Sequence, residues 1–173
     1  MHIYAKNLTT LTIYILISLP IATGLLYIGI RRNMRVTRII AGVLFLASLY
    51  GILSYTVLHR TPSSTHTYTF AAAIGNEFIR ELYMNALLYF PFGLTLSVLV
   101  GPLSILIAFL LSVSIETWQF LTGTGLAQGT DVIMNTLGAA IGVLPCLIVK
   151  HVFKRQTARE QSGEQPKRGK EKS

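Results

Sequence analysis

The sequence predicts an all-α protein, a polytopic membrane helix bundle of about five transmembrane helices with the N-terminus outside and the C-terminus inside. Of the 173 residues, 51% are hydrophobic and 13% are charged, and the mean hydropathy of +0.55 is too high for a soluble core of this size. Apolar runs of about twenty residues recur, and each can cross a hydrocarbon core of roughly 30 Å. The basic residues lie mostly beside these runs, on one predicted side.

The first apolar run extends from about Leu8 to Ile30 and is expected to span the membrane. A signal peptide fits less well, because the run exceeds a typical signal core and its dense positive charge follows it. That charge comes from Arg31, Arg32, Arg35 and Arg38. Together with the eight basic residues from Lys150 onward, they put twelve basic residues on one predicted side of the membrane. The other side has three, namely Lys6, Arg60 and Arg80. The loop after the first run and the C-terminus are therefore predicted to be cytoplasmic.

The second span is expected from about Ile39 to Leu58 and the third from about Leu82 to Val100. In the connection between them, the stretch 68–75 is too short to cross a bilayer. It is expected to lie along the interface or to enter the protein from outside. Within the third span, Pro91 removes a backbone donor, so a kink is expected.

Gly101 and Pro102 form a turn so short that the third and fourth spans must be antiparallel neighbours. The fourth span is expected to end near Phe120. A fifth follows from about Thr130 to Val149, with Thr130 as its N-cap.

Residues 1–149 are therefore predicted to form one transmembrane domain, and residues 150–173 a basic, disordered cytoplasmic tail. The net charge of +8 does not indicate nucleic-acid binding, because the basic residues mostly flank spans, where anionic lipid accounts for them. The expected partner of this charge is the lipid bilayer.

Polar residues inside the apolar runs define a candidate ligand-binding site. Asn85 lies 16 residues before Gly101 and Glu116 lies 15 after it, so both stand roughly 22–24 Å along adjacent helices. Asn135 is expected at the same height, one turn inside the fifth span. The upper edge of this layer is formed by Asp131 and Gln119. Because a carboxylate facing lipid costs at least roughly 2.5 kcal/mol, these groups are expected to face the bundle interior or a wet cavity.

Several of these residues also have a structural interpretation. Glu116 is either ligand-facing or proton-exchanging, or it is tied to Arg60 or hydrogen-bonded to Asn85. Asp131 is favoured in a first helical turn by the helix dipole alone. Arg60 could neutralise a carboxylate, hold an anionic head group or simply reach the interface. The three amides could act as hydrogen-bonding contacts between helices.

Four further residues are assigned structural roles. Gly138 and Gly142 are four apart, which favours close helix packing within the chain rather than dimerisation. Pro91 and Gly93 are also expected to have structural roles rather than to bind a ligand. His59 and His66 lack a matching Cys or clustered acid, so no metal site is predicted, and no cofactor is expected.

Three spaced motifs also carry a resemblance: NALLYFPFG at 85–93, SIETWQF at 114–120 and DVIMNTLG at 131–138. They resemble the signature blocks of the VanZ-like family, and HRTP at 59–62 resembles the Arg-containing segment before the first block. The similarity covers about 50–145. Many members carry an Asn-x-x-Pro-Phe segment after the Arg, whereas this chain has HTYTF at 66–70.

The resemblance implies a small multi-pass protein of the bacterial plasma membrane, in a family named for a member that gives low-level teicoplanin resistance. It supplies no agreed chemistry. The favoured hypothesis is a non-catalytic envelope protein whose outer-leaflet polar pocket binds, or affects access to, a lipoglycopeptide or a lipid-linked wall precursor. One alternative is an intramembrane hydrolase or transferase using Glu116 and Asp131. The other is a small proton-coupled carrier.

Overall fold

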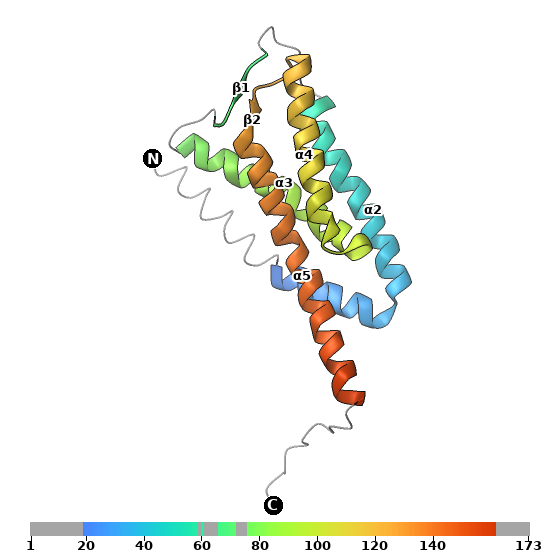
Figure 1. Cartoon of the computed structure of the whole chain (residues 1–173). Helices are drawn as coiled ribbons and strands as arrows, with labels where there is room; N and C mark the ends of the chain where they lie inside the picture. Colours follow the sequence, from blue (N-terminus) through green and yellow to red (C-terminus); the bar gives the residue numbers. More distant parts are fainter. Residues whose placement is uncertain (1–18, 59, 61–65, 72–75, 162–173) are drawn as a thin grey trace, which may run out of the picture.

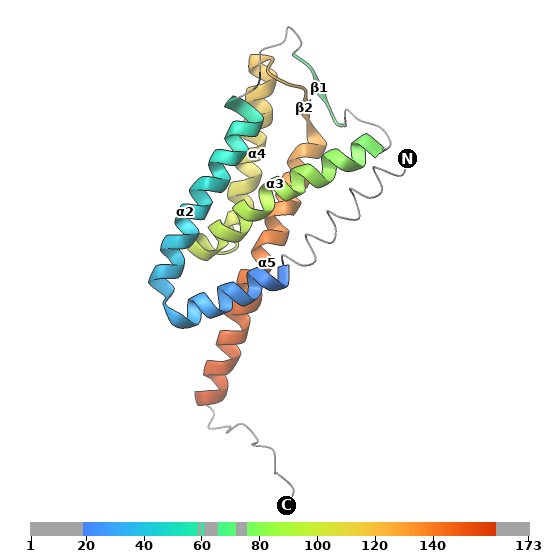
Figure 2. The same ribbon diagram turned by 180° about the vertical axis from the view of Figure 1, so that it is seen from behind.

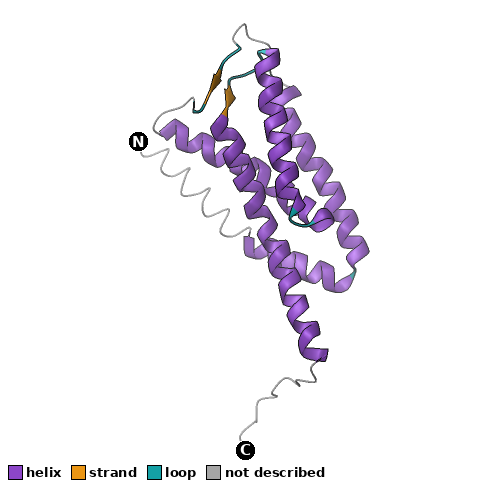
Figure 3. Cartoon of the chain, in the orientation of Figure 1, coloured by secondary structure: helices purple, strands orange, loops and turns teal. Residues whose placement is uncertain are grey.

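Helices dominate the computed structural model, which describes residues 19–58, 60, 66–71 and 76–161 (Figures 1 and 3). Four described helices are long and apolar enough to cross a membrane: Met34–Leu58, Ile79–Val100, Leu103–Thr122 and Gly129–Gln161. The prediction of an all-α membrane bundle is therefore confirmed. The first predicted span, about Leu8 to Ile30, lies partly outside the described residues; of the residues described there, 19–32 are helical.

The second span consists of α2 (Met34–Leu53), which a π-helical turn, η1 (Ser54–Leu58), extends. The Asn33 side chain caps α2 by accepting hydrogen bonds from the amides of Arg35 and Val36. This cap replaces intrahelical partners for two amides at the start of the helix. The preceding helix, 19–32, runs across the lower end of the bundle at a steep angle to α2 (Figures 1 and 2).

The most extensive packing is between α3 (Asn76–Val100) and α5 (Gly129–Gln161). Helix α3 begins earlier than predicted and continues through Pro91. A Cβ on Gly138 would overlap the carbonyl oxygen of Ala86, and one on Gly93 would overlap that of Ala139. A Cβ on Gly142 would lie 2.7 Å from the amide nitrogen of Leu94. The small residues therefore allow the two backbones to touch.

Two glycines with positive φ end helices. Gly101, at φ 69°, lies in the turn between α3 and α4 (Leu103–Thr122), which are neighbours as the short turn predicted. Gly123, at φ 63°, caps the C-terminus of α4 in the left-handed conformation that glycine adopts readily.

The connection before α3 contains a strand that the sequence did not predict. Strand β1 (Tyr68–Thr69) pairs in parallel with β2 (Ala127–Gln128), immediately before α5. The amide of Thr130 also donates to the carbonyl of Phe70 at 3.0 Å. Residues 68–71 therefore lie against the turn between α4 and α5 at the upper end of the bundle, while 72–75 lie outside the described residues (Figure 1).

The prediction of a disordered tail from residue 150 is wrong for its first part, because α5 continues unbroken to Gln161. The Phe153 ring, on this extension, stacks on Tyr27 of the crossing helix with centroids 5.2 Å apart. The extension therefore has a packing partner, which disfavours disorder. Residues 162–173 lie outside the described residues.

The core lies where α2, α3, α4 and α5 meet. Its buried members are Ile52, Tyr89, Phe92, Leu96, Ala108, Ile115 and Ala139. Many large apolar side chains on the outer faces are exposed, as expected of helices that lipid surrounds. Segment 31–38 and the part of α5 after residue 149, which carry most of the described basic residues, both lie at the lower end of the bundle (Figure 1). Most of the described positive charge is therefore at one end, as the predicted orientation requires.

Candidate functional site

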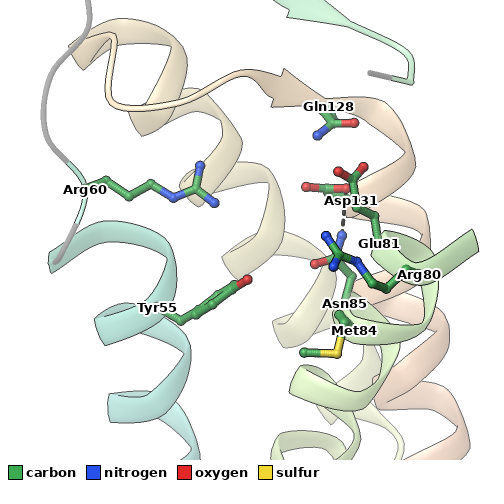
Figure 4. Close-up of a pocket in the computed structure, with 8 residues that line it drawn as sticks. All are labelled: Tyr55, Arg60, Arg80, Glu81, Met84, Asn85, Gln128 and Asp131. Atoms are coloured by element: carbon green, nitrogen blue, oxygen red, sulfur yellow. Dashed lines mark hydrogen bonds between the residues drawn. The ribbon is translucent and has the colours of Figure 1, made fainter. Parts of the chain in front are cut away.

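A cavity of about 490 Å³ lies at the upper end of the bundle, where η1 and α4 end and α5 begins (Figure 4). It is lined by Tyr55, Arg60, Arg80, Glu81, Met84, Asn85, Gln128 and Asp131. These residues come from η1, the segment after it, α3, β2 and α5. Three of the six residues predicted to bind a ligand, namely Arg60, Asn85 and Asp131, are among them.

One wall of the cavity is built on a direct contact between α3 and α5. The Asn85 amide donates to the Asp131 carboxylate at 2.7 Å. The two side chains meet because Asn85 is one turn before Tyr89 in the core and Asp131 is in the first turn of α5. Burial opposes ionisation of this carboxylate, whereas the hydrogen bond and the N-terminal end of the helix dipole favour it. Asp131 is nevertheless partly exposed, so one side of the group remains available to the cavity.

Glu116 lies behind this wall rather than on it. Its side chain is 8% exposed, and its carboxylate accepts a hydrogen bond of 2.7 Å from the backbone amide of Gln128. The hydrogen-bond partner is thus a backbone amide and not Asn85, whereas Arg60, the other partner that the structural interpretation proposed, interacts with Glu116 electrostatically. Glu116 thus holds β2, and with it the lining residue Gln128, against α4.

Gln119 has a comparable supporting position. Its side chain is buried and donates from Nε2 to the carbonyl of Thr56 in η1 at 3.1 Å. Carbonyl groups near a helix C-terminus lack intrahelical partners, so this bond stabilises the end of the second span. Gln119 therefore joins α4 to the wall that carries Tyr55.

A second polar layer lies one helical turn deeper. Asn135, four residues after Asp131, donates from Nδ2 to the hydroxyl of Ser112 at 2.8 Å, and Ser112 is four residues before Glu116. Tyr89, four residues after Asn85, is fully buried near Ser112. Among the described residues, the Tyr89 hydroxyl and Asn135 Oδ1 are buried without a well-formed hydrogen bond. Asn135 therefore belongs to this inner layer and not to the layer of Asn85.

Arg60 lies across the cavity from Asp131, and its guanidinium points into the space between them (Figure 4). It interacts electrostatically with both Asp131 and Glu116. Glu81, one turn before Asn85, adds a second carboxylate close enough to interact with Asp131. Arg80 lies on the same wall as these carboxylates, beside Asn85 (Figure 4), so the wall of α3 and α5 carries both signs and faces the cation of Arg60.

Five lining residues were not predicted as site residues: Tyr55, Arg80, Glu81, Met84 and Gln128. Glu81 had a detectable signal, since it is four residues before Asn85 and therefore shares its helix face. No sequence pattern marks Met84 and Tyr55 as site residues, because side chains of these types are common on lipid-facing helix surfaces. Gln128 lies in the strand pair that the sequence did not predict.

The elements described above define a class: a polytopic helical membrane protein with a charged, amide-containing cavity at one end. A family model described as VanZ/LLP1 matches residues 7–150. Protein VanZ of Enterococcus faecium is 34% identical over 115 residues, which cover 64% of this chain and 68% of that protein. The chain belongs to the VanZ/LLP1 family. No solved structure matches it.

Proposed function

We propose that this protein acts in the bacterial plasma membrane and contributes to resistance against teicoplanin and related lipoglycopeptides. It does so by binding an amphipathic ligand in the upper cavity or by changing access to that ligand. The ligand is the lipoglycopeptide itself or a lipid-linked wall precursor. Membership of the VanZ/LLP1 family and the similarity to Protein VanZ support the resistance role.

The observation that carries the proposal is the charged cavity at the end that the distribution of basic residues predicts to be outside. Ionised side chains within spans are costly and usually functional, and here Asp131 and Glu81 line an accessible space. The partly exposed Asp131 carboxylate can accept a hydrogen bond from a ligand while it keeps its bond to Asn85. Glu116, behind the wall, fits a positioning role better than the acid–base role of the enzymatic alternative.

The test is teicoplanin susceptibility of a sensitive bacterium that expresses the chain or its variants. Asp131→Asn keeps the shape of the side chain and its position beside Asn85 but removes the charge, so resistance should fall to the vector level at normal membrane abundance. Glu116→Gln keeps an oxygen that can accept from the Gln128 amide, so it should retain resistance better than Glu116→Ala.

The matched control is Ser114→Ala, on the exposed face of α4, which should behave like the unchanged chain. A quantitative membrane blot separates the two interpretations of Asp131, because a purely structural role predicts that resistance and protein amount fall together. Unchanged susceptibility on expression of the unmodified chain would remove the resistance role altogether.

A further inference from the structure

The lower edge of the cavity is formed by Tyr55 and Met84, whose side chains point toward each other across it (Figure 4). Tyr55 is 60% exposed and Met84 is 48% exposed, and they belong to two different helices that are apolar and long enough to span. On such helices an exposed apolar surface faces acyl chains. This edge is therefore where the acyl chains of a lipid held in the cavity would meet the bilayer.

The charged groups of the lining cancel formally. Arg60 and Arg80 contribute two positive charges, and Glu81 and Asp131 contribute two negative ones. Electrostatic complementarity therefore favours a ligand that is neutral overall but carries both signs. Arg60 is on one wall, and Arg80 lies with the two carboxylates on the other, so one net positive charge faces one net negative charge (Figure 4). The two charges of the ligand must therefore be separated.

The chemistry of each wall assigns the two ends of the ligand. A guanidinium matches the geometry of phosphate oxygens, with which it forms paired hydrogen bonds. Glu81 and Asp131 are acceptors when ionised and require a donor, and a primary ammonium supplies both N–H groups and charge. The volume of about 490 Å³ is in the range of small-ligand sites and can hold a lipid headgroup.

We propose that the cavity binds the zwitterionic headgroup of a membrane lipid, with its phosphate on Arg60 and its primary ammonium on Asp131 and Glu81. The acyl chains pass between Tyr55 and Met84 into the bilayer. This inference rests on the proposed function in that it takes the same cavity as the ligand site. Two lipid classes share this chemistry: phosphatidylethanolamine and the alanyl ester of phosphatidylglycerol.

The experiment measures lipid binding to the purified full chain by native mass spectrometry, using lipids with identical acyl chains. Phosphatidylethanolamine and phosphatidylcholine form the decisive pair, since both are zwitterionic but only the first has N–H donors. Phosphatidylethanolamine should bind at least about tenfold more tightly, as expected for hydrogen bonds between charged groups. Alanyl phosphatidylglycerol should also exceed phosphatidylcholine, and the tighter of the two identifies the source. Phosphatidylglycerol, which has no ammonium, should bind more weakly than either.

Variants test separately which residues bind the ammonium and which bind the phosphate of the headgroup. Asp131→Asn should abolish the preference for phosphatidylethanolamine over phosphatidylcholine. Glu81→Gln should reduce that preference, and it serves as the test of this wall if the Asp131→Asn protein folds poorly. Arg60→Gln should weaken all phosphate-bearing lipids alike. Lys154→Gln, at the lower end, should change nothing.

Equal binding of phosphatidylethanolamine and phosphatidylcholine to the unmodified chain would overturn the headgroup assignment. A preference that survives both carboxylate variants would also overturn it, because the ammonium would then be recognised elsewhere. If lipid preference is absent but Asp131→Asn still abolishes teicoplanin resistance, the headgroup inference fails and the proposed function stands. If the preference is present but resistance is absent, the proposed resistance role fails and the headgroup inference stands.

Discussion

Gly138→Ala adds a single methyl group at the closest contact between α3 and α5. The new Cβ would overlap the carbonyl oxygen of Ala86 and lie 2.7 Å from its carbonyl carbon and Cα. Ordinary contacts begin at about 3.4 Å, so the two backbones must separate locally by at least roughly 0.7 Å. Overpacking of this kind typically costs 1–3 kcal/mol, and we expect about 2–3 kcal/mol because the obstacle is backbone.

The free-energy change translates into a melting temperature about 4–12 °C lower, using the dependence typical of chains of this length. The assay is thermal unfolding of the purified protein in detergent, followed by the helical circular dichroism signal. The matched control is Gly42→Ala in α2, where a Cβ would meet nothing within 4 Å. That variant should be neutral or about 0.5–1 kcal/mol more stable, since alanine is the better helix former. If the two variants melt at the same temperature, the close approach of α3 and α5 is not what the glycine provides.

Two further perturbations test the layers above and below this contact. Ser112→Ala removes the acceptor of the buried Asn135 amide, so the free energy of unfolding should fall by about 1–3 kcal/mol in a denaturant titration. An unchanged titration would mean that Asn135 has another partner. Phe153→Ala removes the ring stacked on Tyr27, and a double-mutant cycle should give a coupling of about 0.5–1.5 kcal/mol between the two positions. A coupling of zero would show that helix 19–32 does not depend on this extension of α5.

The spans were predictable because lipid allows few solutions. Apolar length located the helices, and the turn at Gly101 placed α3 beside α4. The height argument brought Asn85 and Asp131 to the same end of the bundle but placed Asn85 level with Glu116 and Asn135. The structure instead pairs Asn85 with Asp131 and places Asn135 against Ser112, one turn deeper. The positions of Gly138 and Gly142 against α3 also follow from a pattern in the sequence, since small residues four apart share one helix face.

Other features depend on contacts that leave no local pattern. Glu116 is bonded to a backbone amide, that of Gln128, and any residue at that position except proline would offer the same donor. The strand pair joins two residues near 68 to two near 127, too short a pairing for alternation to be recognised.

The extension of α5 beyond residue 149 could have been predicted from the absence of helix-breaking residues, but the high charge of the tail favoured the prediction of disorder. Residues 150–161 contain neither glycine nor proline, and the first of either is Gly163. Charge alone favoured disorder, whereas the absence of helix breakers and the ring of Phe153 favoured a helix packed on Tyr27.

The central claim is that the charged cavity faces the outside of the cell. The most direct test is labelling of intact cells with a membrane-impermeant maleimide, in a Cys146→Ala background that removes the one native thiol. Gln128→Cys, on the cavity lining, should be labelled in intact cells, and Lys154→Cys only after the membrane is permeabilised. Labelling of Lys154→Cys alone in intact cells would place the cavity on the cytoplasmic side and contradict the account.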